Sequence, residues 1–249
     1  MNGGLTFGNE IFVLDEVTST NSYVQDLVTK TKLIEGYVVR AKTQTNGKGQ
    51  RGNVWETEPH KNLTFSLVLK PNLAVSEQFM LSKVIALGIA DFLQSLNLEQ
   101  VKIKWPNDIW VNNKKVAGIL IENTLKTNKI TTSVVGVGLN VNQHVFSSNL
   151  NATSLQNELN INFDIEALLN DLLVCLEKRY LMLRALQYQR INTDYLSNLL
   201  GYNIELNYKV GRNPCKGIIR GVNPLGLLQL EVNEQLNEFD LKEVSLIDF

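Results

Sequence analysis

The sequence predicts an α+β fold, in which helices flank a β-sheet and a small SH3-like β-barrel follows at the C-terminus. Apolar residues at helical spacing predict two long helices, over Ser76–Leu96 and Asp164–Gln187. Short apolar runs outside these segments predict strands. About 49 residues at the end of the chain carry closely spaced short strands, which is typical of a small barrel. A domain boundary is therefore expected near Leu200, between residues 1–200 and 201–249.

The part before the first long helix alternates strands with one helix and one long loop. A Ser/Thr/Asn cluster in Val17–Asn21 predicts a helix start, because side-chain hydroxyls can accept hydrogen bonds from the first amides. Lys42–Lys61 has no hydrophobic periodicity over about twenty residues, and a loop of that length inside a compact domain is usually functional. The strands expected here are Ile11–Leu14, Gly36–Ala41 and Leu63–Leu69.

The part after the first long helix predicts a strand, a turn and a hairpin. Val101–Trp105 alternates apolar residues with lysines and ends at Pro106-Asn107-Asp108, a turn sequence. A hairpin of Ile109–Val111 and Lys115–Glu122 follows. The remaining expected elements are a strand at Thr131–Val141, a short helix at Asp194–Leu200 capped by Gly201, and strands at Ile204–Leu206, Gly217–Gly221, Leu227–Val232, Glu238–Leu241 and Val244–Ile247.

Composition excludes several classes of protein. The 249 residues include 24 Lys+Arg and 25 Asp+Glu, a net charge of −1, so no basic excess exists for unselective binding to nucleic acid. Hydrophobic residues at 44% exclude a disordered chain. Two cysteines and two histidines, far apart in sequence, exclude a disulfide scaffold and argue against a Cys/His metal site. The first ten residues lack the features of a secretion signal and no apolar run spans a membrane, so a cytoplasmic protein is expected.

The long loop carries a pattern suited to anions. Gly47, Gly49 and Gly52 would let backbone amides approach an anion closely, while Lys48 and Arg51 add positive charge. The spacing matches neither the P-loop nor the dinucleotide-binding fingerprint. Taken alone, the loop is more typical of a solvated glycine-rich segment than of an anion site. The nearby Trp55 can stack on a purine or fill the core.

Three further features point to the predicted sheet. Asn107 and Asp108 follow a strand, where Asp108 can bind magnesium or simply build the turn. Lys115 begins an apolar strand, where a lysine often only blunts a sheet edge. Gly118 in that strand weakens the sheet unless something must approach its backbone. The next strand also contains residues that are unusual within a sheet: Gly136, Gly138 and Asn140. Two neighbouring strands with glycines indicate either a ligand against the sheet or tight helix packing.

The order of these motifs resembles biotin protein ligase over nearly the whole chain. The resemblance implies a mixed sheet with helices, as in the class II synthetase-like fold of biotin and lipoate ligases. It also implies an enzyme that joins biotin to ATP and transfers biotin to a lysine of a carboxylase's biotin carboxyl carrier domain. The motifs are Ser19-Thr20-Asn21, the loop from Gln44 to Trp55, KWPND at 104–108, KVAGILIE at 115–122 and GVGLNVN at 136–142.

The resemblance also implies roles for individual residues. Ser19, Thr20, Asn21, Gln44, Gly47, Lys48, Gly49, Lys115, Gly118 and Gly138 would bind biotin. Gln50, Arg51, Trp55, Asn107 and Asn140 would bind ATP or the adenylate. Lys115, Arg51, Lys48 and Asp108 would act in catalysis, with Asp108 also a ligand of Mg2+.

Two departures from the family are visible. Gln50 and Asn53 are neutral where the family's loop is commonly basic, which predicts a weaker hold on the adenylate. Only ten residues precede the pattern, so a monofunctional ligase without DNA binding is expected, as a monomer or a homodimer. The alternatives are a lipoate or octanoate ligase of the same fold, and a non-catalytic module that binds biotin or RNA. A cluster at Lys209, Arg212, Lys216 and Arg220 supports the RNA-binding module only weakly, because nearby acidic residues balance it.

Overall fold

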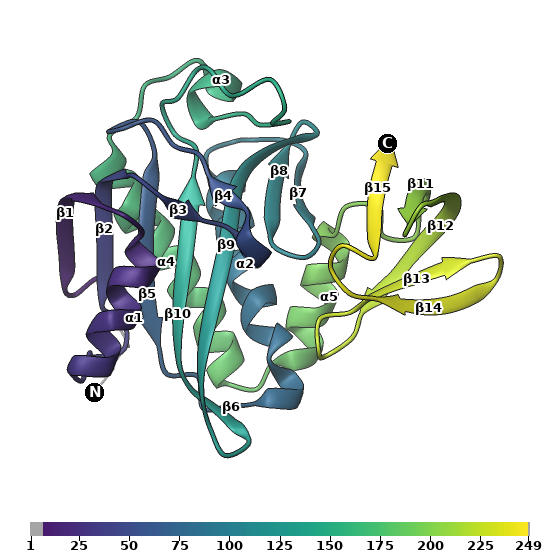
Figure 1. Ribbon diagram of the computed structural model, residues 1–249, viewed down its shortest axis with the longest axis horizontal. Helices are drawn as coiled ribbons and strands as arrows, with labels where there is room; N and C mark the ends of the chain where they lie inside the picture. The colour runs from purple at the N-terminus through teal and green to yellow at the C-terminus, as the bar shows by residue number, and fades with distance from the viewer. Residues whose placement is uncertain (1–6, 249) are drawn as a thin grey trace.

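A computed structural model describes residues 7–248 of the chain, and its main body is built on one mixed β-sheet (Figure 1). Strands β1 and β2 run parallel, whereas the other neighbouring pairs in this sheet are antiparallel. The prediction that the N-terminus carries no secretion signal falls largely on residues 1–6, outside the described residues. In spatial order the strands are β1 (Ile11–Val17), β2 (Val38–Gln44), β5 (Leu63–Leu69), β10 (Lys129–Leu139), β9 (Lys114–Lys126), β8 (Asp108–Val111) and β7 (Val101–Lys104), with β6 (Leu73–Ala74) beside β10.

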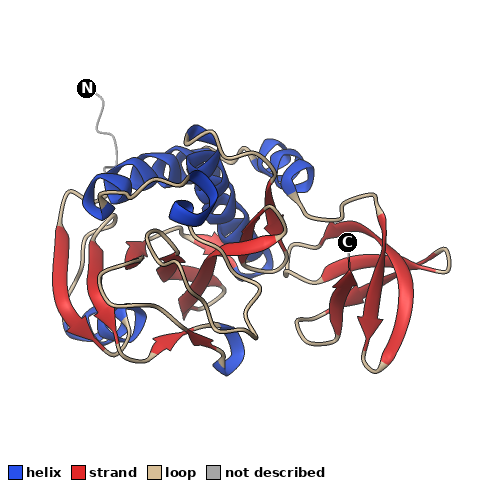
Figure 2. Cartoon of the chain, turned by 90° about the horizontal axis from the view of Figure 1, so that it is seen from above, coloured by secondary structure: helices blue, strands red, loops and turns tan. Residues whose placement is uncertain are grey.

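The two faces of this sheet are covered by different helices. On one face, α1 (Thr20–Lys30) packs its Val24 into a small cluster with Val39, Val68 and Val134. On the other face lie α2 (Phe79–Ser95) and α4 (Ile165–Arg184), which Figure 2 shows as a layer along the sheet. Because side chains of a strand alternate between faces, Val38 joins the larger core under α2 and α4 while Val39 faces α1.

The two long helices form as their apolar spacing predicts. Asp164 caps α4 by accepting hydrogen bonds from the amides of Glu166 and Ala167. Gly88 of α2 faces Leu176 of α4, where an added Cβ would lie only 2.9 Å from the Leu176 Cα. The predicted long helices are therefore confirmed, with ends within a few residues of the expected ones. The buried face of α4 comprises Leu168, Leu169, Leu172, Leu173, Leu176, Tyr180 and Leu183.

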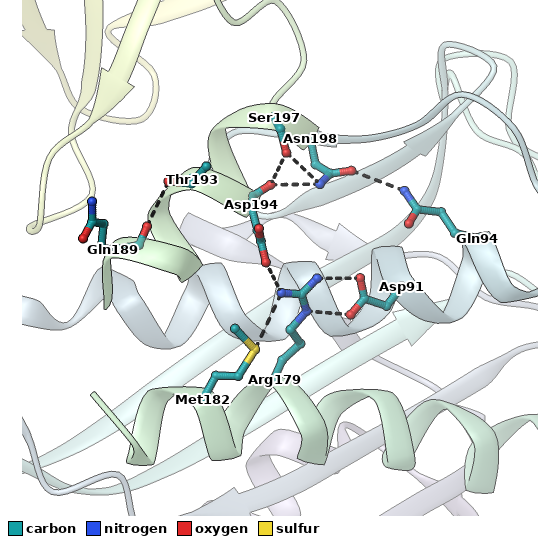
Figure 3. Close-up of polar contacts among 9 residues, drawn as sticks. All are labelled: Asp91, Gln94, Arg179, Met182, Gln189, Thr193, Asp194, Ser197 and Asn198. Atoms are coloured by element: carbon teal, nitrogen blue, oxygen red, sulfur yellow. Dashed lines mark hydrogen bonds and ion pairs between the residues drawn. The ribbon is translucent and has the colours of Figure 1, made fainter. Parts of the chain in front are cut away.

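A partly buried ion-pair network ties a third helix to these two (Figure 3). Arg179 of α4 binds Asp91 of α2 with two parallel hydrogen bonds of 2.6 and 2.8 Å, and also contacts Asp194 of α5 (Tyr188–Asn198). These carboxylates raise the pKa of the Arg179 guanidinium further above its usual value. Because the pairs are largely shielded from water, the network fixes α5 against α2 and α4.

Two helical segments differ from the sequence prediction. The short helix begins at Tyr188, six residues before the predicted start at Asp194. The sequence did not reveal this first part, because only Ile191 and Tyr195 are buried and the apolar pattern is faint. It ends at Asn198, and Gly201 adopts a positive φ in the following turn instead of capping the helix directly. A further short helix, α3 (Leu155–Leu159), was not predicted, although Ser154 caps it through the amide of Asn157.

The C-terminal unit is a five-stranded antiparallel sheet, which is consistent with the predicted SH3-like unit. Within the described residues, β14 and β15 are its two edges and do not pair with each other, so the expected closed barrel is not formed. In place of a ladder there is a single isolated bridge, which joins Val244 to Leu241 in the turn that follows β14. The spatial order is β14 (Gln235–Phe239), β13 (Leu228–Val232), β12 (Asn213–Val222), β11 (Glu205–Val210) and β15 (Val244–Asp248).

The boundary expected near Leu200 stays a prediction, because the core is continuous across it. Leu200 donates a backbone hydrogen bond to Ile103 of the main sheet. Lys83 of α2 is buried at the junction, where its ammonium donates to Asn192 of α5 and to the Val222 carbonyl of β12. Among the described residues, no helix is long and apolar enough to cross a membrane.

Candidate active site

A cavity of about 300 Å3 lies between the main sheet, the glycine-containing loop and the C-terminal sheet. Its floor is formed by β9 and β10, and Leu241 and Leu246 of the C-terminal unit line its opposite side. The cavity therefore gathers residues that are more than two hundred positions apart in the sequence. Of the residues predicted as functional, those that line it are Ser19, Thr20, Asn21, Gln44, Lys48, Gly49, Gln50, Trp55, Asn107, Asp108, Lys115, Gly118 and Gly138.

The glycine loop, Gly47–Trp55, folds into a small hairpin over this cavity. Strand β3 (Gly47–Lys48) pairs with β4 (Val54–Trp55), and a short 3-10 turn, Gln50–Gly52, joins them. Gly52 has a φ of 86°, a left-handed conformation that glycine adopts without steric cost. The loop is thus a compact flap with Lys48 and Gln50 on the cavity lining.

Trp55 explains two of the glycines in the sheet. A Cβ at Gly138 would lie 2.4 Å from Trp55 Cε2, and a Cβ at Gly118 would lie 3.0 Å from Trp55 Cζ3. The indole therefore lies directly on the backbone of β9 and β10. Its buried Nε1 has no hydrogen-bond partner among the described residues, and a buried donor left in this way indicates a missing acceptor.

Lys115 and Asp108 form an ion pair at one end of the cavity. Their side chains are 31% and 23% exposed, and Lys115 Nζ lies 2.7 Å from Asp108 Oδ1. A register shift between β8 and β9, which pairs Trp110 with Lys115, brings the two residues to the same place. Lys115 Nζ also lies 5.4 Å from the centre of a Trp55 ring. This end of the cavity therefore holds a positioned cation beside an aromatic face.

Lys104 is a cavity cation that the sequence prediction did not include among the site residues. Its ammonium lies 4.1 Å from the centre of a Trp110 ring, and burial lowers the pKa of Lys104. The alternation of Lys102 and Lys104 with apolar residues was the available signal, because it places both lysines on the same face of β7. Three lysines, Lys48, Lys104 and Lys115, face one carboxylate, Asp108, so the lining carries an excess of positive charge that favours anions.

The opposite end of the cavity is polar and uncharged. Gln44 Oε1 accepts a hydrogen bond of 2.8 Å from the backbone amide of Thr20 and lies 3.2 Å from Thr20 Oγ1. Gln44 thereby satisfies the first amide of α1, a role that the sequence prediction had assigned to a hydroxyl of the Ser/Thr/Asn cluster. Ser66, which the sequence prediction also missed, lies 2.8 Å from Thr20 Oγ1 and 2.6 Å from Asn21 Oδ1.

Three predicted site residues do not line the cavity. The Arg51 guanidinium binds the carboxylate of Asp240 and the carbonyl of Leu241, so it ties the glycine loop to the C-terminal unit. Asn140 is buried and donates to the Thr153 carbonyl. Gly47 is buried where an added Cβ would lie 2.5 Å from the Trp55 carbonyl, so a side chain there would disturb the pairing of β3 with β4.

The donor set for a metal ion is small. Among the described residues, no group of three or more His, Cys, Asp or Glu side chains is arranged to hold an ion. Asp108 is the single carboxylate on the described lining of the cavity. Magnesium is commonly held by one or two carboxylates together with substrate phosphates, so Asp108 fits a site completed by a nucleotide.

Comparison with known proteins identifies the family. A model of the biotin/lipoate A/B protein ligase family matches residues 13–140. The bifunctional ligase/repressor BirA of Escherichia coli (strain K12) is 31% identical over 248 residues, which cover 96% of this chain and 74% of that protein. The chain belongs to the biotin/lipoate A/B protein ligase family. The family predicted from the order of the sequence motifs is therefore confirmed.

Two further members of the family are similar over most of their length. The biotin–[acetyl-CoA-carboxylase] ligase of Mycobacterium tuberculosis is 29% identical over 231 residues, which cover 88% of this chain and 83% of that protein. A solved structure, the biotin protein ligase from Aquifex aeolicus in complex with biotin and ATP, aligns with a TM-score of 0.77 and 25% identity. It covers 96% of this chain and 99% of that one, so the predicted family fold is confirmed.

Proposed function

We propose that the chain is a biotin protein ligase, an enzyme that activates biotin with ATP and transfers it to a lysine of a biotin carboxyl carrier domain. The single observation that carries this is the division of one cavity into a neutral hydrogen-bonding end and a cationic end. Thr20 and Gln44 form the first end, and Lys115 and Lys104 form the second. Biotin has the same two parts, a neutral ring with polar groups and a carboxylate at the end of a chain.

The first step joins two anions, which explains the lysines. An oxygen of the biotin carboxylate bonds to the α-phosphorus of ATP, and the bond from that phosphorus to the bridging oxygen breaks as pyrophosphate leaves. Negative charge develops on the phosphoryl oxygens during this exchange. Lys115, fixed by Asp108, and the half-buried Lys104 supply positive charge before the reaction begins, so little reorganisation is needed.

Magnesium fits the same end of the cavity. When bound with the nucleotide it would shield the charge of the triphosphate, and Asp108 is the residue that would hold it.

The glycine loop and Trp55 protect the product of this step. Biotinyl-adenylate is a mixed anhydride that water hydrolyses, so it must be covered until the acceptor arrives. The β3–β4 hairpin lies over the cavity, and Arg51 holds it to the C-terminal unit through Asp240. On the cavity lining this flap presents one cation, Lys48, together with the neutral Gln50.

The second step requires a neutral amine. The nitrogen of the acceptor lysine bonds to the carbonyl carbon of the adenylate, the bond to the phosphate oxygen breaks, and AMP leaves. The amine must lose a proton in this step. We propose that Asp108 receives it, because Asp108 is the single carboxylate on the described lining of the cavity.

A lipoate or octanoate ligase is the second candidate, because the matched family includes such enzymes. A dithiolane ring or a plain alkyl chain could neither accept a hydrogen bond from Gln44 Nε2 nor donate one to Thr20 Oγ1, although both side chains would keep their contacts within the chain. Gln44 Nε2 would then stay without an acceptor among the described residues, and an unpaired polar group in a binding site discriminates against such a substrate. The polar end of the cavity therefore favours biotin.

Pyrophosphate exchange into ATP tests the proposed function and this alternative together. The purified chain is incubated with ATP, Mg2+ and labelled pyrophosphate, with biotin, lipoate, octanoate or no acid. Exchange that depends on biotin alone is expected. Exchange that depends on lipoate or octanoate instead would support the second candidate. If no acid stimulates exchange, the chain would be a non-catalytic binding module.

A further inference from the structure

A chain of buried hydrogen bonds connects the cavity to a carboxylate that does not line it. The chain runs from Gln44 through Thr20, Ser66 and Asn21 to Glu122 of β9. Thr20, Ser66 and Asn21 are each less than 5% exposed. Buried polar networks of this kind fix the direction of each hydrogen bond, because every proton must find an acceptor.

The orientation of the Asn21 carboxamide is set by the sheet. Its Nδ2 donates 2.9 Å to Glu122 Oε2 and 3.2 Å to the Leu120 carbonyl, and neither of these oxygens can donate in return. Both amide protons are thereby used, and Oδ1 is left facing Ser66. Gly136 makes room for this arrangement, since a Cβ there would lie 2.3 Å from Asn21 Oδ1.

The direction of the remaining bonds follows by counting protons. Asn21 Oδ1 can only accept, so the single proton of Ser66 Oγ is donated to it across 2.6 Å. The contact of 2.8 Å between Ser66 Oγ and Thr20 Oγ1 must then use the proton of Thr20 Oγ1, because two oxygens at this distance need a proton between them. The longer contact of 3.2 Å between Thr20 Oγ1 and Gln44 Oε1 therefore receives none. Thr20 Oγ1 has no proton left for the cavity, and it presents lone pairs there.

Gln44 is oriented in the opposite sense. Its Oε1 accepts from the backbone amide of Thr20, so its Nε2 is the end that can donate. None of the described residues accepts a hydrogen bond from this nitrogen. The neutral end of the cavity therefore offers one acceptor, Thr20 Oγ1, beside one donor, Gln44 Nε2.

We infer that Glu122 and Ser66 are positioning residues for the biotin ring: through Asn21 they fix Thr20 as an acceptor, so that the cavity matches the N–H and C=O groups of a cyclic urea. This inference rests on the proposed function and deepens it. If the direction of these hydrogen bonds were reversed, Thr20 would donate into the cavity and the urea N–H would have no partner. Glu122 thus affects selectivity for the acid substrate without touching it.

Three substitutions test this hydrogen-bond chain. The KM values are measured in biotin-dependent pyrophosphate exchange, and thermal unfolding checks that each variant is folded. Ser66→Ala removes the relay, and we expect the KM for biotin to rise about tenfold or more, since a buried polar group loses its partner. Glu122→Leu removes the acceptor for Asn21, and a rise in the same direction is expected. Glu122→Gln still offers an oxygen to Asn21 Nδ2, so a KM for biotin within about twofold of the wild type is expected. The KM for ATP should stay unchanged in all three variants.

Ser133→Ala is the matched control. Like Ser66, Ser133 is fully buried in the main sheet and does not line the cavity, but its hydroxyl donates 2.7 Å to Asn123 and has no part in the hydrogen-bond chain to Thr20. Its loss should leave both KM values unchanged.

The outcomes separate the inference from the proposed function. Folded Ser66→Ala and Glu122→Leu variants with a wild-type KM for biotin would overturn the inference that Ser66 and Glu122 orient Thr20. A Glu122→Gln variant with a KM for biotin as high as that of Glu122→Leu would also overturn it. An equal rise in the KM for ATP would also overturn it, because that would indicate general damage to the cavity. If the wild type itself shows no biotin-dependent exchange, the proposed function fails instead.

Discussion

The indole of Trp55 lies on the bare backbone of Gly138, so close that a single added methyl group would lie 2.4 Å from its ring. This contact couples the glycine loop to the floor of the cavity, because Trp55 is the last residue of the β3–β4 hairpin. The position of the flap therefore depends on the absence of a side chain in β10.

Gly138→Ala is expected to displace Trp55 and loosen the flap. Overpacking at such a site typically costs about 1–3 kcal/mol. Biotinyl-adenylate formed beforehand should be released faster than from the wild type. The release rate is measured by rapid dilution into unlabelled substrates. Gly221→Ala is the control, since a Cβ there meets only the mobile end of Gln229. Equal release from all three proteins would show that Trp55 does not hold the flap in place.

Gln50→Arg is expected to slow the loss of the adenylate. Gln50 lines the cavity, so arginine there would add a cation near the phosphate, whereas Arg51 is already bound to Asp240. Charges on partly exposed groups are usually worth under about 1 kcal/mol, which sets a slowing of about fivefold as the upper range. Off-rates of the intermediate measure the effect, with Asn213→Arg on the exposed surface of β12 as the charge-matched control. An off-rate no slower than that of the control would contradict the expectation.

Lys83 is expected to make stability depend on pH. Burial lowers its pKa from 10.5 to about 8 against the opposing attraction of the Glu77 carboxylate. The groups in contact with its ammonium are Asn192, the Val222 carbonyl and the rings of Phe79 and Tyr195. Below pH 8 both folded and unfolded chains carry the proton. Between about pH 8 and 10.5 the unfolded chain binds more protons, so the contribution of Lys83 to the free energy of unfolding rises with pH.

Urea unfolding at a series of pH values between 7.5 and 10, chosen to bracket this window, measures the effect. In Lys83→Met the residue cannot titrate, so the rise of the free energy of unfolding with pH should be smaller than in the wild type. Identical pH profiles for the two proteins would mean that Lys83 keeps its proton in the folded state.

Local patterns were sufficient to predict most of the fold. Apolar spacing located α2 and α4, since their buried faces are long and continuous. It found α5 but placed its start six residues late, because only two of its eleven residues are buried. The unclosed C-terminal sheet also escaped prediction, because edge pairing depends on where the turn at 240–243 directs β15, and neighbouring residues do not encode that.

Site residues in short sequence motifs could be predicted, whereas those that depend on contacts between distant positions could not. The motifs located Lys115, Asp108 and Gln44, since each lies within a short recognisable run. Ser66 and Glu122 were missed because their contacts with Asn21 join positions 45 and 101 residues away. The contact of Arg51 with Asp240 was missed because the two residues lie 189 positions apart, and the role of Arg51 at the adenylate stays a prediction. The sequence also indicated a ligand over Gly118 and Gly138, where the folded chain places Trp55.

The central claim is that Lys115 acts on the anions that meet in this cavity, and one pair of neighbouring variants tests it. Lys115→Ala removes the cation paired with Asp108, whereas Lys114→Ala removes an exposed lysine one residue away. Biotin-dependent pyrophosphate exchange should fall about 100-fold or more in Lys115→Ala, the range seen when a preorganised electrostatic group is lost. It should be unchanged in Lys114→Ala, with both variants folded. Wild-type exchange in Lys115→Ala would contradict the account.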